Sequence, residues 1–213
     1  MRHQLSAVEN IIFDLGGVIL DLDYSLTIQA LSKLAGYDVA EHYGQQAQAE
    51  FFSQFEIGAI TAAEFRLGLK QLLSFEASDE AVDSAWSALI LAFPPERVEL
   101  VRQVGRKKRT FLLSNINELH LMTSDRKFTE AMGTGLGRLA DQFERVYYSH
   151  LVGDRKPNVS IFQKVIDENH LEPAKTLFLD DTAHNLIGAQ QVGLQTVLIT
   201  KETPIESLNL PDF

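Results

Sequence analysis

The chain has 213 residues, 45% of them hydrophobic and 23% charged, which is enough for one domain with a sizeable core or for a core with a small accessory domain. Its formal net charge of −10 disfavours nucleic acid as the main partner, because phosphate backbones attract basic surfaces. It contains no cysteine, which excludes disulfides, thiolate metal sites and cysteine nucleophiles, and no apolar run long enough to cross a bilayer.

These features also bear on compartment and partners. A reducing cytoplasm is the default for a chain without cysteine, and the start MRHQLSAVENIIFD reaches charged residues too early for a secretory signal. We therefore predict a cytoplasmic monomer or homodimer with no nucleic-acid and no membrane partner. A small phosphorylated metabolite remains possible as a partner, since one local positive charge and a metal suffice to bind it.

The first predicted element is a buried strand at 10–14, an apolar run that ends on Asp14. Residues 24–93 then show only helical patterns, over 25–36, 61–73 and 82–90. Thr61 and Glu64 form a capping box before the second of these. We interpret 23–93 as a helical cap domain over the carboxyl end of the first strand, and 1–22 with 94–213 as the core domain.

Strands and helices alternate through the rest of the chain. Further strands are predicted at 109–113, 144–148, 176–179 and 196–200. Helices are predicted at 159–169, with Asn158 as its N-cap, and at 183–192, ending before Gly193. This alternation indicates an α/β fold with a doubly wound, Rossmann-like, mostly parallel sheet.

Polar residues follow the carboxyl ends of four predicted strands. They are Asp14, Ser114 with Asn115, Lys156 within GDRKPN, and Asp180 with Asp181. Ligands of open parallel sheets bind outside these ends, so we expect the side chains to converge on one crevice. Three carboxylates in one pocket repel one another, and a hard divalent cation such as Mg²⁺ relieves that repulsion.

This set of side chains predicts phosphoryl transfer. Mg²⁺ suits a site of one or two carboxylates plus a substrate phosphate. Lys156 and Ser114 would hold the remaining phosphate oxygens. Asp14 would act as the nucleophile and form an aspartyl-phosphate intermediate.

Four segments, taken in order along the chain, resemble the motifs of the haloacid dehalogenase superfamily. They are IIFDLGGV, FLLSN, GDRKPNVSIF and TLFLDDTAHN, and the helical insert occupies the position of that family's cap. The resemblance implies a nucleophile and metal ligand at Asp14, phosphate-binding groups at Gly17, Ser114 and Asn115, a charge-neutralising lysine at Lys156, and metal ligands at Asp180, Asp181 and the carbonyl of Gly16. It implies an Mg²⁺-dependent phosphatase acting on a small phosphate monoester, with a sugar phosphate as the expected substrate.

Gly16 departs from the commonest pattern of this family, whose phosphatases carry a second aspartate there as general acid and base. The opening DLGGVILDLD resembles instead the bacterial sugar-phosphatase branch that shares this glycine and includes α-D-glucose-1-phosphate phosphatase. A general acid and base at this position typically raises the rate by about 10²–10⁴-fold, and Gly16 cannot supply it. We therefore expect the rate to depend steeply on the leaving group, unless Asp21, Asp23 or a cap residue supplies the proton.

Two other functions stay open from the sequence. A 2-haloacid dehalogenase would use the same Asp14, but dehalogenases of this superfamily lack the acidic pair found here at Asp180 and Asp181. A catalytically weak, phosphometabolite-binding or regulatory protein is favoured by Gly16 and disfavoured by the intact Asp14, Lys156 and Asp181.

Four residues near the motifs have alternative interpretations. Asp181 is expected to cap the helix after it in addition to binding metal, and Asn185, one turn on, to orient a metal ligand. Asp21 and Asp23 are expected to mark the hinge into the cap.

Overall fold

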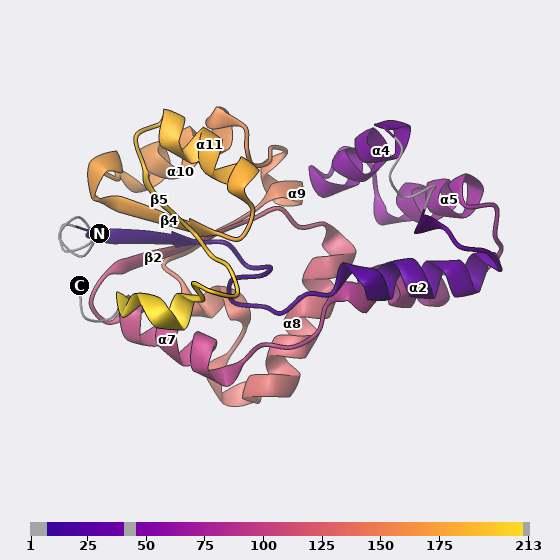
Figure 1. Ribbon diagram of the computed structural model, residues 1–213, viewed down its shortest axis with the longest axis horizontal. Helices are drawn as coiled ribbons and strands as arrows, with labels where there is room; N and C mark the ends of the chain where they lie inside the picture. The colour runs from indigo at the N-terminus through magenta and orange to yellow at the C-terminus, as the bar shows by residue number, and fades with distance from the viewer. Residues whose placement is uncertain (1–7, 41–45, 211–213) are drawn as a thin grey trace.

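A five-stranded sheet forms the centre of the protein (Figure 1). The structure, a computed structural model, describes residues 8–40 and 46–210. The strands are β1 (Asn10–Phe13), β2 (Arg109–Ser114), β3 (Arg145–Tyr148), β4 (Thr176–Asp180) and β5 (Gln195–Leu198). Their order is β3-β2-β1-β4-β5, and all four pairings are parallel. The five predicted strands are thus confirmed to within two residues at each end.

Helices cover both faces of the sheet, which is what a strand buried along its whole length, such as β1, requires. One face carries α7 (Pro95–Gly105) and α8 (Glu118–Met132), and the other carries α10 (Val159–Asn169) and α11 (Ala183–Gln191). Side chains of β1 alternate between the two layers. Ile11 and Phe13 join the cluster that includes Val98 of α7, whereas Ile12 joins the cluster that includes Val165 of α10.

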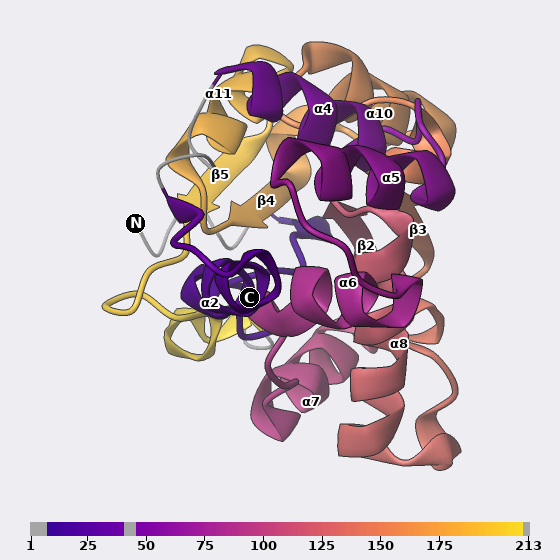
Figure 2. The same ribbon diagram turned by 90° about the vertical axis from the view of Figure 1, so that its right-hand side faces the viewer.

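Four helices between β1 and β2 lie to one side of the sheet, at the right of Figure 1 and toward the viewer in Figure 2. They are α2 (Tyr24–Ala35), α4 (Gln46–Glu56), α5 (Ala62–Leu72) and α6 (Asp79–Trp86). Their apolar faces form a third cluster, built on Phe55, Phe65 and Trp86, which receives only Leu119 from the core helices. These helices therefore share a small core of their own.

Local signals explain most of these helix ends. Asp23 caps α2 by accepting from the Ser25 N–H, and Gly36, with φ of 77°, ends it. The predicted capping box of Thr61 and Glu64 is present at the start of α5. The third predicted pattern, 82–90, is only partly helical, because the chain leaves α6 at Trp86 and becomes extended at Ile90.

The chain enters and leaves this helical unit through two paired segments. Leu22 and Ile90 form an antiparallel bridge, and the N–H of Asp21 donates to the carbonyl of Ala92 at 2.9 Å. The N–H of Asp23 donates to the carbonyl of Leu89 at 2.8 Å. The two crossings are thus held to each other immediately beside the carboxyl end of β1.

Short elements complete the chain: η1 (Ser87–Leu89), η2 (Thr134–Leu136), η3 (Leu139–Gln142), α9 (Ser149–Val152), η4 (Pro173–Lys175) and η5 (Ile205–Leu208). Across residues 8–40 and 46–210, no helix combines the length and apolar character needed to cross a bilayer. The predicted capping role of Asn158 is wrong in one respect: it holds the N-cap position of α10, but its side chain donates to Asp154 at 2.7 Å instead of capping the helix.

Candidate active site

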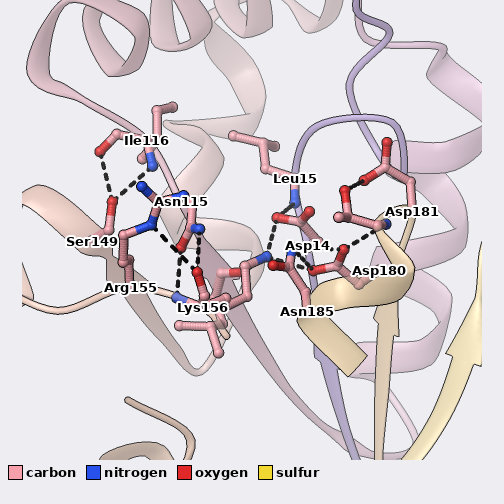
Figure 3. A network of polar contacts seen from close by, with 12 residues as sticks. Asp14, Leu15, Asn115, Ile116, Ser149, Arg155, Lys156, Asp180, Asp181 and Asn185 are labelled. Atoms are coloured by element: carbon pink, nitrogen blue, oxygen red, sulfur yellow. Dashed lines mark hydrogen bonds and ion pairs between the residues drawn. The ribbon is translucent and has the colours of Figure 1, made fainter. Parts of the chain in front are cut away.

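The carboxyl ends of β1 and β4 bring the first acids together. Asp14 follows β1 directly, and its N–H donates to the carbonyl of Leu179 in β4 at 2.8 Å. Asp180 is the last residue of β4, so its side chain lies beside Asp14 (Figure 3). The convergence expected of parallel strands is therefore what the register produces.

Lys156 joins these two acids from the loop between α9 and α10. Its side chain is completely buried, with Nζ 2.8 Å from Oδ1 of Asp14 and 2.7 Å from Oδ2 of Asp180. The same Nζ donates to the carbonyl of Leu113 at 3.0 Å. All three partners of the ammonium are thus oxygens, and two of them carry charge.

Asn115 fixes the backbone of Lys156. Its Nδ2 donates to the Lys156 carbonyl and its Oδ1 accepts from the Lys156 N–H, both at 2.9 Å. The predicted phosphate-binding residue Asn115 is therefore at the site, with its amide engaged by the protein. Gly17 is also at the site, and its N–H donates to Leu20. Both remain predictions as substrate-binding residues.

Asp180 is tied down on its other side by α11. Nδ2 of Asn185 lies 3.0 and 3.1 Å from its two oxygens, which gives Asn185 the orienting position that the sequence suggested. Asp180 Oδ1 also accepts from the N–H of Thr182 at 2.8 Å. The expectation that Asp181 caps α11 is wrong, because Thr182 takes the N-cap position and Asp181 instead accepts from the Thr182 hydroxyl at 3.1 Å.

Asp14, Asp180 and Asp181 offer carboxylate oxygens that all lie within 4.8 Å of one another. Gly17 makes room for this approach. Its φ is +69°, and a Cβ at this position would lie 2.0 Å from Oδ2 of Asp181. The second glycine of the DLGG segment is thus needed for both its backbone and its lack of a side chain.

The three carboxylates of this cluster repel one another, so positive charge nearby stabilises their ionised forms. Burial raises the pKa of Asp14 and Asp180 raises it further, while Lys156 opposes both. Burial and Asp180 also raise the pKa of Asp181. For Lys156, burial lowers the pKa, but the two acids outweigh it and the net shift is upward, so the ammonium persists.

Gly16 has no positive φ, and its close neighbour is the flexible end of a side chain. A Cβ there would lie 2.6 Å from Cδ1 of Leu22. The two nearby acids of the crossing segments have partners of their own: Asp21 pairs with Arg97 at 2.8 Å, and Asp23 caps α2. Both lie in the crossing segments, as the hinge interpretation expected.

A cavity of about 370 Å³ opens beside Gly16 and Ser114 and extends beneath the helical unit. It is lined from the core by residues near the ends of β1 and β2, and from the opposite side by α2, α4 and α6. Its size falls within the range of small-molecule sites. The described lining residues include Leu15, Leu20, Leu22, Tyr24, Phe52, Ser53, Glu56, Trp86, Asn117, His120 and Arg155.

Several of these cavity residues give no signal in the sequence. Glu56 ends α4 and reads as a surface acid, yet Arg155 Nη1 lies 2.8 Å from its Oε2. Tyr24 begins α2, and His120 lies in the first turn of α8. An apolar position at Trp86 predicts helix core, which is confirmed, but the side chain lines the cavity as well.

The donor set suits a hard divalent cation. Oδ2 of Asp14 and Oδ2 of Asp181 have no hydrogen-bond partner among the residues that the structure describes, and both belong to the three-carboxylate cluster. An all-oxygen set with two unengaged carboxylate oxygens is the kind that Mg²⁺ prefers. The fold and the site thus define an α/β protein that holds three carboxylates and a buried lysine at the carboxyl edge of its parallel sheet.

Comparison with known proteins agrees with that class. The haloacid dehalogenase-like hydrolase family matches residues 8–193. D-ribitol-5-phosphate phosphatase of Bacteroides thetaiotaomicron is 29% identical over 189 residues, covering 89% of this chain and 90% of the relative. A sesquiterpene phosphatase of Aspergillus oryzae is 24% identical over 89% of this chain and 88% of its own length.

A solved structure is also similar. It is a haloacid dehalogenase family enzyme from Bacteroides thetaiotaomicron in complex with magnesium and inorganic phosphate, with a TM-score of 0.85 and 29% identity. The match covers 95% of this chain and 99% of the other. The chain belongs to the haloacid dehalogenase-like hydrolase family, and it is a hydrolase of the phosphatase type.

Proposed function

We propose that this enzyme hydrolyses a small phosphate monoester of the sugar or polyol class, with Mg²⁺, through an aspartyl-phosphate on Asp14. The observation that carries the proposal is the contact of Asp14 with Lys156, beside two further acids, next in the chain to Leu15 and Arg155, which line a cavity of about 370 Å³. The cavity would accommodate the organic part of such a substrate, and the adjacent charged cluster would accommodate its phosphate.

Asp14, Asp180 and Asp181 would hold the metal, with the carbonyl of Gly16 as a further ligand. When bound, Mg²⁺ supplies positive charge that offsets the carboxylates and the substrate phosphate. This requirement distinguishes a phosphatase from a 2-haloacid dehalogenase of the same superfamily, in which the acidic pair is missing. The three-carboxylate cluster therefore favours the phosphatase.

The chain's own residues carry the covalent steps. Lys156 and the N–H of Leu15 both bond Oδ1 of Asp14, which leaves Oδ2 to attack phosphorus while the bond to the leaving oxygen breaks. The Ser114 hydroxyl, buried and facing the cavity, would hold a phosphate oxygen. Water then displaces the phosphate from Asp14 and restores the carboxylate.

The helical unit, for which we propose the bounds 23–93, would act as a cap domain that selects the substrate. Its contributions to the cavity are mixed: Phe52 and Trp86 are apolar, whereas Ser53 and Glu56 offer hydrogen bonds. A polyhydroxylated substrate fits this mixture better than a hydrocarbon one. The similarity to a phosphatase of D-ribitol 5-phosphate supports the same class.

The test is phosphate release from a panel of phosphorylated sugars, polyols and prenyl alcohols, with and without Mg²⁺. Hydrolysis of a sugar or polyol phosphate that stops in excess chelator is expected. Turnover that continues unchanged in chelator would remove the metal from the proposal, and a preference for prenyl phosphates would remove the substrate class.

Two substitutions test the residues. Asp14→Asn should abolish turnover with the fold retained, because an amide is a poor nucleophile. Lys156→Ala should lower kcat by at least about 10²-fold, since charge on the phosphate and on Asp14 then lacks its buried partner. Circular dichroism and steady-state kinetics are the measurements, and a wild-type rate in either folded variant would contradict the placement of the site.

A further inference from the structure

We propose that Glu56, carried by the cap helix α4, is the general acid and base of this enzyme and replaces the aspartate that Gly16 lacks. The inference rests on the proposed phosphatase function and names the residue that moves the proton in it. It starts from the position of Glu56, which lines the same cavity as Gly16 and Ser114.

Glu56 is the only carboxylic acid among the described residues that line this cavity. The other titratable groups there are unsuited to proton transfer near neutral pH. Burial and the charges of Asp181 and Asp14 raise the pKa of Tyr24 to about 12. Burial lowers the pKa of His120 to about 4, and both of its ring nitrogens are already hydrogen-bonded. Arg155 stays charged throughout.

The carboxyl group of Glu56 is held with one oxygen available. Oε2 is buried and forms an ion pair with Nη1 of Arg155 at 2.8 Å, while the hydrogen bond of that Nη1 goes to the Ser53 hydroxyl at 2.8 Å. Oε1 has no protein partner within the described part of the chain, and the side chain keeps 25% of its exposure. A free oxygen on a carboxyl group of fixed orientation is the arrangement that proton transfer to a bound ligand requires.

The position of Glu56 is also fixed relative to the core. The Ser149 hydroxyl, just after β3, lies 2.6 Å from the Glu56 carbonyl oxygen. Arg155 precedes Lys156 in the chain, so two consecutive residues of the same loop contact Glu56 and Asp14. The cap acid and the nucleophile are thus positioned by one segment.

The environment shifts the pKa of Glu56 upward. Burial raises the pKa of Glu56, whereas Arg155 and then Lys156 lower it, and the net shift is upward. Tyr24 of α2, the remaining titratable group facing it from the cap, is a neutral phenol. A raised pKa moves the group toward the working pH of an acid–base catalyst.

The two half-reactions then balance. As Oδ2 of Asp14 bonds to phosphorus, the bond from phosphorus to the leaving oxygen breaks and that oxygen takes the proton of Glu56. The Glu56 carboxylate next removes a proton from the attacking water, whose oxygen displaces Asp14 from phosphorus. The products are the free alcohol and inorganic phosphate, and Glu56 is again protonated.

The experiment compares wild type and Glu56→Gln on alkyl and aryl phosphates of graded leaving-group pKa, with Mg²⁺. In wild type, kcat/KM should depend weakly on the leaving group. In Glu56→Gln it should fall about 10²–10⁴-fold for alkyl phosphates and less than about tenfold for nitrophenyl phosphate. The variant should also release a burst of nitrophenol, because the aspartyl-phosphate forms but its hydrolysis lacks a base.

Glu50→Gln is the matched control, since Glu50 lies on the same helix and is exposed. It should behave as wild type, and Glu56→Asp should recover part of the lost alkyl-phosphate activity. In wild type, kcat/KM should decline as rising pH deprotonates Glu56, and this decline should vanish in Glu56→Gln.

Equal losses of kcat/KM for all leaving groups, with no burst, would overturn the assignment and make Glu56 a structural or substrate-binding residue. So would a Glu56→Gln variant that retains full alkyl-phosphate activity. Failure of the phosphatase function itself looks different: wild type would then release no phosphate from any member of the series, or would do so independently of Asp14.

Discussion

At the scale of single residues, the two glycines after Asp14, which are Gly16 and Gly17, differ in backbone conformation and in the side chains around them. Gly17 has a left-handed φ and lies where Asp181 needs the space of a side chain. Gly16 has an ordinary φ, and its neighbour is the flexible end of Leu22. The sequence draws attention to the glycine pair, but it does not show what surrounds each one. Gly17 lies against Asp181, which is distant in the chain. Gly16 lies against Leu22, which is six residues on.

Gly17→Ala should therefore be severe. The new methyl group would displace Asp181, and a residue other than glycine in the left-handed region costs about 1–2 kcal/mol. We expect a loss of at least about tenfold in kcat and weaker Mg²⁺ activation, measured by titrating Mg²⁺ against the initial rate. Unchanged Mg²⁺ dependence would show that Asp181 does not serve the metal.

Gly16→Asp tests whether the missing acid can be restored. Alone it should lower activity on all substrates, because the side chain meets Leu22. Combined with Leu22→Ala, in a chain that also carries Glu56→Gln, it should recover alkyl-phosphate hydrolysis by at least about tenfold over Glu56→Gln alone, which is roughly one order below the usual low end of acid–base assistance. Leu22→Ala with Glu56→Gln is the control, and equal rates for the two combinations would contradict the steric explanation.

At the scale of elements, α8 contacts the helical unit through His120 as well as through Leu119. The ring of His120 stacks on Trp86 of α6, with centroids 5.0 Å apart, and its Nε2 lies 3.1 Å from the Trp86 carbonyl. Asn117, the N-cap of α8, donates through its Nδ2 to Nδ1 of His120. This arrangement requires a neutral imidazole with its proton on Nε2.

Stability should consequently fall in mild acid. Burial lowers the pKa of His120 to about 4 from the model-peptide value of 6.5, so the unfolded chain takes up this proton first. The contribution is complete above about pH 6.5 and is lost as pH falls toward 4, by up to about 1.4 kcal/mol per pH unit. Urea unfolding between pH 7 and 4.5 measures it.

His120→Gln keeps a hydrogen-bonding side chain that does not titrate. Its free energy of unfolding should change less steeply with pH over that window than that of wild type. His184→Gln is the control, because His184 is exposed and should leave the slope unchanged. Identical slopes for wild type and His120→Gln would mean that the acid sensitivity comes from other groups.

At the scale of the whole molecule, the sequence predicts the core of the site well and its cap poorly. Asp14, Asp180 and the end of β2 meet because parallel strands bring their carboxyl ends to one edge, a rule that needs no coordinates. Lys156 follows from its motif. Glu56 meets Arg155, 99 positions along the chain, only after helices α2 to α6 pack into their own cluster. No local pattern encodes that docking.

Two local features of the site also depend on the packed structure and could not be predicted from the sequence. Asp181 reads as a helix cap, but α11 begins one residue later, with Thr182 at its N-cap, and the Asp181 carboxylate accepts from the Thr182 hydroxyl. Leu22 reads as one more apolar residue, yet it fills the place where an aspartate at position 16 would stand. Side-chain competition for one space is decided by the packed structure.

Because the metal would join β1 and β4 at the centre of the molecule, Mg²⁺ should stabilise the whole fold. A ligand present at 100 times its Kd stabilises the native state by about 2.7 kcal/mol, which corresponds to a rise in Tm of roughly 5–10 °C for a chain of this size. Differential scanning fluorimetry with and without Mg²⁺ measures this. Asp181→Asn should abolish most of the rise, whereas Glu76→Gln, which removes an exposed charge, should leave it intact. An equal rise in both variants would show that Mg²⁺ acts by screening the net charge of −10 and not at the three-carboxylate cluster.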